Sequence, residues 1–87
     1  MKEPHEILIH PMTTEKSVRL MEARNELVFI VAEKATKLQI KKAFEKLFKV
    51  KVIKINTVND IRGRKKAFIR LHADYPATDV GTRLGLI

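Results

Sequence analysis

Four cationic side chains lie within five residues of one another, at Arg62, Arg64, Lys65 and Lys66 around Gly63. An arginine presents a planar fork that matches a phosphate group with two hydrogen bonds, and a lysine adds a point charge. A turn that carries these groups at the tip of a hairpin would hold them against a phosphate backbone. The alternative is a solvated turn whose lysines protect the edge of a sheet from aggregation. This segment alone supports both interpretations equally.

A second cluster of cations spans residues 34–49, where Glu45 is the one acid. Its lysines are Lys34, Lys37, Lys41, Lys42, Lys46 and Lys49. The whole chain carries 18 Lys and Arg against 10 Asp and Glu, for a net charge of +8. A lysine-rich helix face is often merely solvated, but a soluble domain without a polyanionic partner usually mixes both signs of charge. Together the two clusters favour binding to nucleic acid, with an anionic membrane as the second candidate.

Signals for catalysis are weak in this sequence. The three histidines, His5, His10 and His72, do not have the spacing of a metal site. The glycines match no phosphate-binding loop, and there is no cysteine for a disulfide or a thiolate ligand. We therefore predict a protein that is not an enzyme and has no catalytic residue, metal or cofactor. The longest apolar run, residues 27–32, is too short for a membrane span.

The first part of the chain predicts two strands separated by a helix. Residues 6–10 are a short strand candidate that a proline ends. A helix follows, capped by Thr13 or Thr14 and ended by Asn25. Residues 26–34 form a strand with apolar side chains on both faces, so helices should cover the sheet on both sides.

The clearest helix begins at Thr36, which has the spacing of a capping box with Gln39. The remaining arc carries Lys41, Lys42, Lys46 and Lys49, so the apolar stripe should face the sheet. The residues of this stripe are Ile40, Ala43, Phe44, Leu47 and Phe48.

Two further strands predict a hairpin over residues 50–61 and 66–73, with the basic turn at its tip. In the first of these strands, Ile53, Ile55 and Thr57 should share one face by alternation. Lys54 and Asn56 should share the other face, which Val52 and Val58 make only partly polar.

The tail predicts one or two turns of helix from Ala77, broken by Gly81 and Gly85. The predicted order is therefore β-α-β-α-β-β with a short C-terminal helical turn. This order predicts an α+β fold, with a four-stranded and mainly antiparallel sheet flanked by helices, in a single domain over residues 1–87.

Five segments in series resemble the large-subunit ribosomal protein twenty-three family in its archaeal type. They are "HPMTTEKS", "AEKATKLQIKKAFEKLFKVKV", "INTVN", "KKAFIRL" and "DYPATDVGTRLGLI", in the order of the family. The resemblance implies a structural rRNA-binding protein of the cytoplasmic large ribosomal subunit, beside the exit of the nascent-peptide tunnel. It also implies an antiparallel sheet flanked by helices, in agreement with the order of elements above.

The resemblance implies protein partners as well as large-subunit rRNA. Family members neighbour ribosomal protein twenty-nine and form part of a docking site for the signal recognition particle, the translocon or other nascent-chain factors. The glutamate of the T-E-K motif belongs to that docking surface in bacterial members, and it corresponds to Glu15. Arg19 and Glu22 share the helical arc of Glu15, away from the apolar side, and we assign them to the same surface. No small-molecule substrate is implied.

Family motifs and the basic clusters together assign the rRNA contacts, and folded RNA bound through shape and backbone suits this composition best. The charge of the clusters contributes Lys41, Arg62 and Arg64. The motifs contribute the other residues, which are Lys16, Lys34, Thr36, Lys37, Asn56, Thr57, Lys65, Lys66 and Arg70.

The chain departs from the family pattern in two places. Bacterial members have a long loop between the last two strands, whereas residues 60–65 predict a short turn, which favours rRNA anchoring over tunnel lining. The long basic N-terminal extension of the eukaryotic form is not seen, which favours an archaeal, cytoplasmic protein. Two other classes stay open. One is a free-standing nucleic-acid protein such as a small chromatin factor, and the other is a small phosphate-handling enzyme, which the short turn fits poorly.

Overall fold

The computed structural model describes residues 3–86 of the chain. Its strands form one antiparallel sheet in the order β1-β2-β4-β3, so β4 lies between β2 and β3. The predicted α+β fold and its order of elements are confirmed. In chain order the elements are α1 (Pro4–Ile7), β1 (Leu8–Pro11), α2 (Glu15–Arg24), β2 (Glu26–Val31), α3 (Lys37–Phe48), β3 (Val52–Asn59), β4 (Lys65–Leu71) and α4 (Ala77–Arg83).

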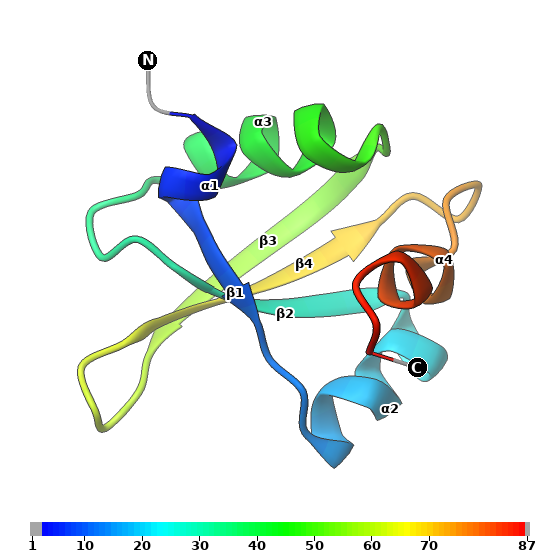
Figure 1. Cartoon of the computed structure of the whole chain (residues 1–87), viewed down its shortest axis with the longest axis horizontal. Helices are drawn as coiled ribbons and strands as arrows, with labels where there is room; N and C mark the ends of the chain where they lie inside the picture. The colour runs from blue at the N-terminus through cyan, green and yellow to red at the C-terminus, as the bar shows by residue number, and fades with distance from the viewer. Residues whose placement is uncertain (1–2, 87) are drawn as a thin grey trace.

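The core lies between one face of the sheet and the helices, with α3 as the largest contributor. Ile7 of α1, Met21 of α2 and Val80 of α4 also belong to it. In Figure 1, α1 lies against α3 at the top of the view, and α2 and α4 lie close together at the right. The rings of Phe29 in β2 and Phe44 in α3 meet edge to face, with centroids 5.5 Å apart. Phe48 contacts Phe44 at a centroid distance of 4.6 Å. Such pairs add to the stabilisation from burial alone, and all three rings are buried, as predicted.

Particular side chains mark both ends of α2. Those at its start accept hydrogen bonds from free backbone N–H groups, and the residue after its end adopts a left-handed conformation. Thr14 Oγ1 accepts a hydrogen bond from the N–H of Ser17 at 3.1 Å, and Ser17 Oγ accepts one from the N–H of Thr14 at 2.8 Å. At the other end, Asn25 adopts a left-handed conformation with φ of 56°, which asparagine tolerates better than most residues. Thr14 rather than Thr13 is therefore the cap, and Glu15 is the first helical residue.

The capping box predicted at the start of α3 is confirmed. Thr36 Oγ1 accepts from the N–H of Gln39 at 3.1 Å, and Gln39 Oε1 accepts from the N–H of Thr36 at 3.0 Å. The helix ends at Phe48, and Lys49 follows with φ of 57°. Arg83 Nη1 donates to the carbonyl of Phe48 at 3.2 Å, which places a cation at the negative end of the helix dipole.

The buried face of α3 is smaller than its apolar stripe predicts. Ile40, Ala43, Phe44 and Phe48 are buried, but Leu47 is 49% exposed. Leu47 lies in the last turn of α3, and the neighbouring α1 is only 4 residues long. Periodicity identifies the arc of a helix that faces the fold, but not how much of its length other elements cover.

A β-bulge at the start of β3 changes the burial predicted for that strand. The register shifts between Val52 and Lys54, so Val52 is buried with Ile55 whereas Ile53 is 57% exposed. The prediction that Ile53 shares a face with Ile55 is wrong, because the extra residue of a bulge reverses the alternation. Glu45 Oε2 of α3 accepts a hydrogen bond from the N–H of Val52 at 2.9 Å and holds the bulge against the helix.

α4 begins at Ala77, as predicted, but it continues through Gly81, where a break was expected. The N–H of Leu86 donates to the carbonyl of Gly81 at 2.8 Å, and the N–H of Gly85 donates to that of Thr82 at 3.1 Å. These two bonds and the φ of 76° at Gly85 make a Schellman motif. Gly85 therefore ends the helix, while Gly81 is buried within it.

A helical turn replaces the beginning of the first predicted strand. Residues 4–7 form α1, in which Pro4 occupies the first turn, where its missing N–H costs nothing. The strand itself starts at Leu8 and includes Pro11, which an edge strand such as β1 accommodates.

β2 is buried on both faces, as its continuous apolar sequence predicts. Leu27 and Phe29 belong to the core beneath α3, and Val28 and Ile30 are buried on the opposite face. Leu20 of α2 lines the same hollow as Val28. α2 therefore reaches this second face at one edge, but the prediction that helices cover the sheet on both sides is wrong for β3 and β4, whose side chains on this face are exposed or half-buried.

Asn25 ties the end of α2 to the segment before α4. Its Nδ2 donates to the carbonyl oxygens of Leu71 at 3.1 Å, His72 at 3.3 Å and Tyr75 at 3.1 Å. Its Oδ1 accepts from the N–H of Ala77 at 2.6 Å. One partly buried amide thus satisfies backbone groups that lie 46 to 52 residues further along the chain.

Candidate RNA-binding surfaces

The face of the sheet opposite the aromatic core carries cations from β3 and β4. Pairing of the two strands sets Lys54 beside Arg70 and Asn56 beside Phe68, and paired residues of antiparallel strands point to the same face. Lys66 shares this face, because it lies two residues before Phe68 on β4. We call Lys54, Asn56, Lys66, Phe68 and Arg70 the open sheet face; each of them is exposed or half-buried.

α2 adds a further cation at one end of the open sheet face. A shallow hollow of about 60 Å³ is lined there by Lys16, Lys66 and Phe68, among others. Two ammonium groups beside an aromatic ring can bind a phosphate next to a surface on which a base stacks. Of the residues that the sequence assigns to rRNA, the structure thus brings together Lys16, Asn56, Lys66 and Arg70.

Lys54 and Phe68 belong to the open sheet face although the sequence analysis did not assign them to RNA. Lys54 precedes Asn56 by two residues on one strand, so alternation places both side chains on one face. Phe68 stands between Lys66 and Arg70 in the same way. Strand periodicity around the assigned residues was therefore the signal that could have found them.

The charges at the hairpin tip are partly engaged within the turn. Asp60 Oδ1 accepts from the N–H groups of Arg62 and Arg64, each at 2.9 Å, and its Oδ2 pairs with Arg64 Nε at 3.1 Å. Gly63 takes a φ of 80°, a conformation that glycine adopts without strain. The exposed guanidinium of Arg62 is in none of the ion pairs formed within residues 3–86. Arg62 is therefore better placed than Arg64 to reach a phosphate.

Lys65 holds the connection between β2 and α3. Its Nζ lies 2.7 Å from the carbonyl oxygen of Ala35 and 3.5 Å from that of Glu33. An ammonium group that satisfies backbone carbonyls in this way has a structural role. Reversing the charge of Lys65 would therefore disturb the fold together with any RNA contact.

The other predicted contacts lie around the start of α3 and on β3. Lys34, Lys37 and Lys41 are exposed there, while Thr36 is engaged in the capping box. Thr57 is half-buried on the core side of β3. The predicted rRNA contacts thus fall into the open sheet face, the hairpin tip and the start of α3, which are separate surfaces.

Glu15 and Arg19 form an ion pair on the surface of α2. Glu15 Oε1 lies 2.9 Å from Arg19 Nη2, and both side chains are well exposed. An exposed pair of this spacing contributes about 0.3–0.5 kcal/mol. Glu22 is exposed on the same helix and lines a hollow of about 350 Å³ with Arg24 and Arg70. The three residues assigned to factor docking are thus all at the surface.

Hydrogen bonds within the tip lower the pKa of the Asp60 carboxyl group below its ordinary value. The backbone N–H of Arg64 is the largest cause; the N–H of Arg62 and the Arg64 guanidinium add to it, and partial burial opposes them. A carboxylate whose folded pKa is lowered stabilises the fold above its unfolded pKa of about 4. This contribution is lost as the pH falls through the folded pKa.

Acid is therefore expected to loosen the hairpin tip before the sheet unfolds. The amide signals of Arg62 and Arg64 should shift, and exchange faster with solvent, as the pH is lowered below about 4. The amide of Ile69 in β4 should stay protected over the same range. Asp60→Asn keeps an acceptor for both N–H groups but cannot ionise, so it should abolish the change. The same titration in that variant would show that another group is responsible.

Within residues 3–86, no helix combines the length and the apolar character that crossing a membrane requires. The described part of the chain also brings together no cluster of three or more histidine or carboxylate side chains that could hold a metal ion.

Comparison with known proteins places the chain in a family. The family model described as ribosomal protein L23 matches residues 6–72. Large ribosomal subunit protein uL23 of Tetrahymena thermophila is 49% identical over 83 residues, which cover 95% of this chain and 55% of that protein. Large ribosomal subunit protein uL23A of Caenorhabditis elegans is 47% identical over 81 residues, covering 93% of this chain and 55% of that protein.

The chain spans about half the length of these curated relatives. Both relatives are eukaryotic, and the archaeal type stays a prediction. The family match covers most of the chain, and the two relatives share almost half of the aligned residues. The chain therefore belongs to the ribosomal protein L23 family, as its motifs indicated.

Proposed function

We propose that this chain is a non-catalytic, structural component of the large ribosomal subunit that binds large-subunit rRNA in the cytoplasm. Membership of the ribosomal protein L23 family is the observation that carries this proposal. The relatives named above are large-subunit ribosomal proteins. The net charge of +8 and the cations of the open sheet face support RNA as the ligand.

The proposed RNA surface contains the residues assigned from the sequence, together with Lys54 and Phe68 of the open sheet face. Lysine and arginine contacts to phosphates position the protein on folded RNA without reading its sequence. Lys65 serves this surface indirectly, by fixing the connection before α3. If about six phosphates are neutralised, affinity should fall about a thousandfold between 50 and 200 mM salt.

We also propose that the protein lies beside the exit of the nascent-peptide tunnel, next to ribosomal protein twenty-nine. There it would form part of the docking site for the signal recognition particle, the translocon or other nascent-chain factors. The resemblance of the T-E-K motif supports this placement, as does the exposure of Glu15, Arg19 and Glu22 on α2.

Sedimentation tests the ribosomal role. A tagged copy of the chain, expressed in cells, should sediment with the large subunit through a sucrose gradient at moderate salt. A copy that sediments with DNA or as a free protein under the same conditions would favour a free-standing nucleic-acid protein instead.

Glu15→Ala tests the docking surface. We expect incorporation into the large subunit to be unchanged, because Glu15 is exposed and its loss costs less than about 1 kcal/mol of stability. Binding of the signal recognition particle to purified subunits should weaken about three- to tenfold, through the lost charge. Glu33→Ala removes an exposed acid from another part of the surface and should leave binding unchanged. If the parent protein, Glu15→Ala and Glu33→Ala all bind equally well, Glu15 has only a structural role at the start of α2.

A further inference from the structure

A hollow between α1 and α3 adjoins the start of α3, because Leu38 lines both this hollow and a second one that is lined by Lys37 and Lys41. The hollow between α1 and α3 has a volume of about 190 Å³ and none of the residues assigned to rRNA lines it. Pro4, Ile7, Leu38 and Ala43 supply its apolar wall. Ile7 and Ala43 are buried, whereas Leu38 is 60% exposed at the rim. A large aliphatic side chain left open beside an apolar hollow favours a partner that removes both from water.

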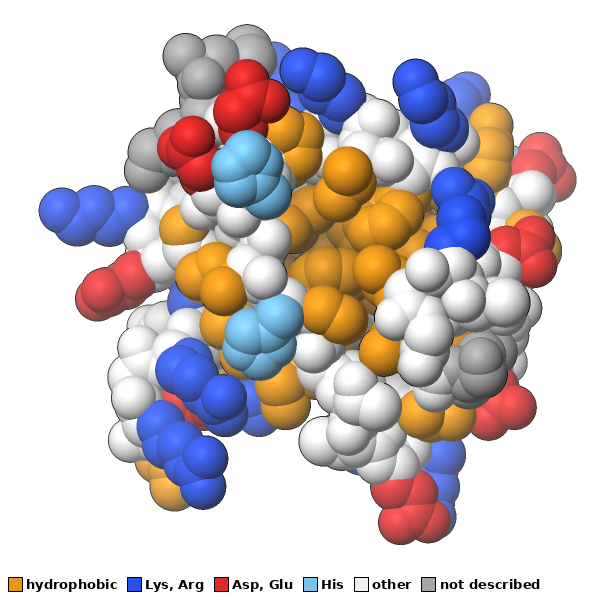
Figure 2. All heavy atoms as spheres, in the orientation of Figure 1, with side chains coloured by type: hydrophobic (Ala, Val, Ile, Leu, Met, Phe, Trp, Pro, Cys, Tyr) orange, Lys and Arg blue, Asp and Glu red, His pale blue; other side chains and the backbone are white. Residues whose placement is uncertain are grey.

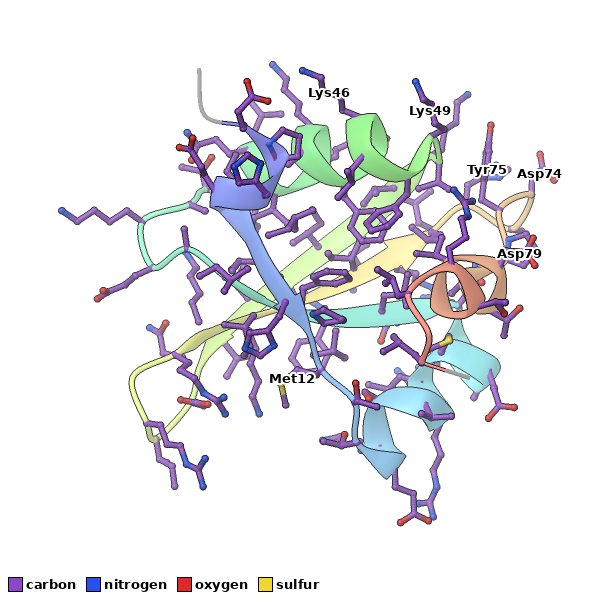
Figure 3. All side chains as sticks on the ribbon, in the orientation of Figure 1. Met12, Lys46, Lys49, Asp74, Tyr75 and Asp79 are labelled. Carbon is purple, nitrogen blue, oxygen red and sulfur yellow. The ribbon has the colours of Figure 1, made fainter. Side chains whose placement is uncertain are left out.

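The same hollow is bordered by two lysines of α3. Lys42 and Lys46 line it and are exposed; Figure 3 shows Lys46 extending outward from the helix. Neither forms an ion pair within the described chain. Glu45, between them in sequence, is turned to the N–H of Val52 instead. The two lysines therefore have no ion-pair partner within residues 3–86, although the exposed acids Glu3, the N-cap of α1, and Glu6 lie on the other side of the hollow.

The surface around the hollow likewise has apolar side chains at its centre and charged side chains at its edge. In Figure 2, hydrophobic side chains gather at the centre of the viewed face, and lysines, arginines and acidic side chains lie around its edge. The combination of apolar wall and cationic rim discriminates between partners. A phosphate backbone would use the lysines and leave the aliphatic wall uncovered, and no aromatic ring lines the hollow to stack with a base.

We propose that this hollow docks an acidic segment of another protein, which inserts one bulky apolar side chain and pairs carboxylates with Lys42 and Lys46. The volume is larger than that of an apolar cavity of about 150 Å³ that holds benzene, so a phenylalanine or leucine side chain fits. Lysines four apart on a helix have Cβ atoms about 5–6 Å apart. Acids two residues apart in an extended segment have a similar spacing, because each residue rises about 3.3 Å. The proposal does not depend on the ribosomal role.

A short peptide with a phenylalanine, followed by aspartates two and four positions later, is the probe. Titrated at low salt into the isotope-labelled protein, it should shift amide signals of α1 and of the lining residues of α3. The paired variant Lys42→Glu with Lys46→Glu should weaken binding about tenfold or more. Lys49→Glu, a charge reversal beyond the end of α3 and outside the hollow, should change it less than about twofold.

The apolar part of the proposal is tested separately. Leu38→Ser should weaken binding, and because Leu38 is exposed this variant should fold as the parent does. A peptide with serine in place of the phenylalanine should bind weakly or not at all. Equal binding of the two peptides, or equal loss with Lys49→Glu and with the Lys42 and Lys46 pair, would overturn the proposal. Shifts of the same lining residues by an RNA oligonucleotide, in competition with the peptide, would also overturn it.

Discussion

Asn25→Ala is expected to lower the free energy of unfolding by about 2–4 kcal/mol. The amide of Asn25 donates to three carbonyl oxygens of the segment before α4 and accepts from the N–H of Ala77. Alanine would leave the carbonyls of Leu71 and Tyr75 and the N–H of Ala77 without the Asn25 amide, while the carbonyl of His72 keeps the N–H of Tyr75. It would also have to adopt the left-handed conformation that Asn25 takes at φ of 56°. Urea unfolding followed by circular dichroism measures the effect.

Two further variants separate the effect of the lost hydrogen bonds from that of the left-handed backbone conformation. Asn25→Gly removes the side chain but adopts a positive φ without strain, so it should be more stable than Asn25→Ala by about 1 kcal/mol. Asn25→Asp keeps the acceptor for Ala77 but sets a carboxylate against the carbonyls of Leu71, His72 and Tyr75, and should also be destabilised. Parental stability in Asn25→Ala would show that the amide network contributes little.

The second large effect concerns RNA binding by the open sheet face. Replacing Lys66 and Arg70 together by glutamine should weaken binding to a large-subunit rRNA fragment about ten- to a hundredfold at moderate salt. Each lost phosphate contact removes about 0.7–0.9 from the slope of log affinity against log salt, so the loss of two contacts should lower the slope by about 1.4–1.8. Glutamine is chosen rather than glutamate because Glu26 lies opposite Arg70 on the neighbouring strand. A glutamate at position 70 would repel Glu26.

Binding measured from about 50 to 200 mM salt gives both quantities. Lys42→Gln with Lys46→Gln removes the same charge from α3, away from the sheet, and serves as the matched control. The control should keep most of the affinity, because exposed charges further apart than about 10 Å are largely screened at 0.1 M salt. Equal losses in the two double variants would mean that net charge, rather than the open sheet face, determines binding.

Local signals in the sequence predict most elements of this fold. The spacing of Thr36 and Gln39 identified the start of α3, because both partners of a capping box lie within one helical turn. Asn25 identified the end of α2, because few other residues tolerate its backbone conformation. The continuous apolar run of β2 predicted a strand buried on both faces, and its burial confirms this.

Features that depend on distant segments were predicted less well. Ile53 and Leu47 are exposed although their patterns predicted otherwise, since burial there depends on a bulge opposite β4 and on the length of α1. Gly81 continues a helix because the stop comes from the Schellman motif at Gly85. The turn of helix at residues 4–7 carries too few residues for periodicity to identify it.

For the candidate RNA surface, too, the sequence predicted single residues well but not their arrangement in space. Charge and family motifs pointed to Lys16, Asn56, Lys66 and Arg70, but only the strand register shows that they share one face. The sequence could not show that the ammonium of Lys65 is bound to backbone carbonyls, because its partners lie 30 and 32 residues earlier in the chain. These assignments to RNA stay predictions until binding is measured.

The place of β4 in the sheet has a consequence for synthesis on the ribosome. β3 pairs with β4 alone, and β4 also supplies a neighbour to β2. Until Leu71 has left the tunnel, a nascent copy can join β1 to β2, but β3 has no strand to pair with. The carbonyl groups that Asn25 binds arrive at the same late stage. An interrupted copy therefore exposes apolar strands that a finished copy hides, and exposed apolar surface of this kind is what chaperones and proteases bind.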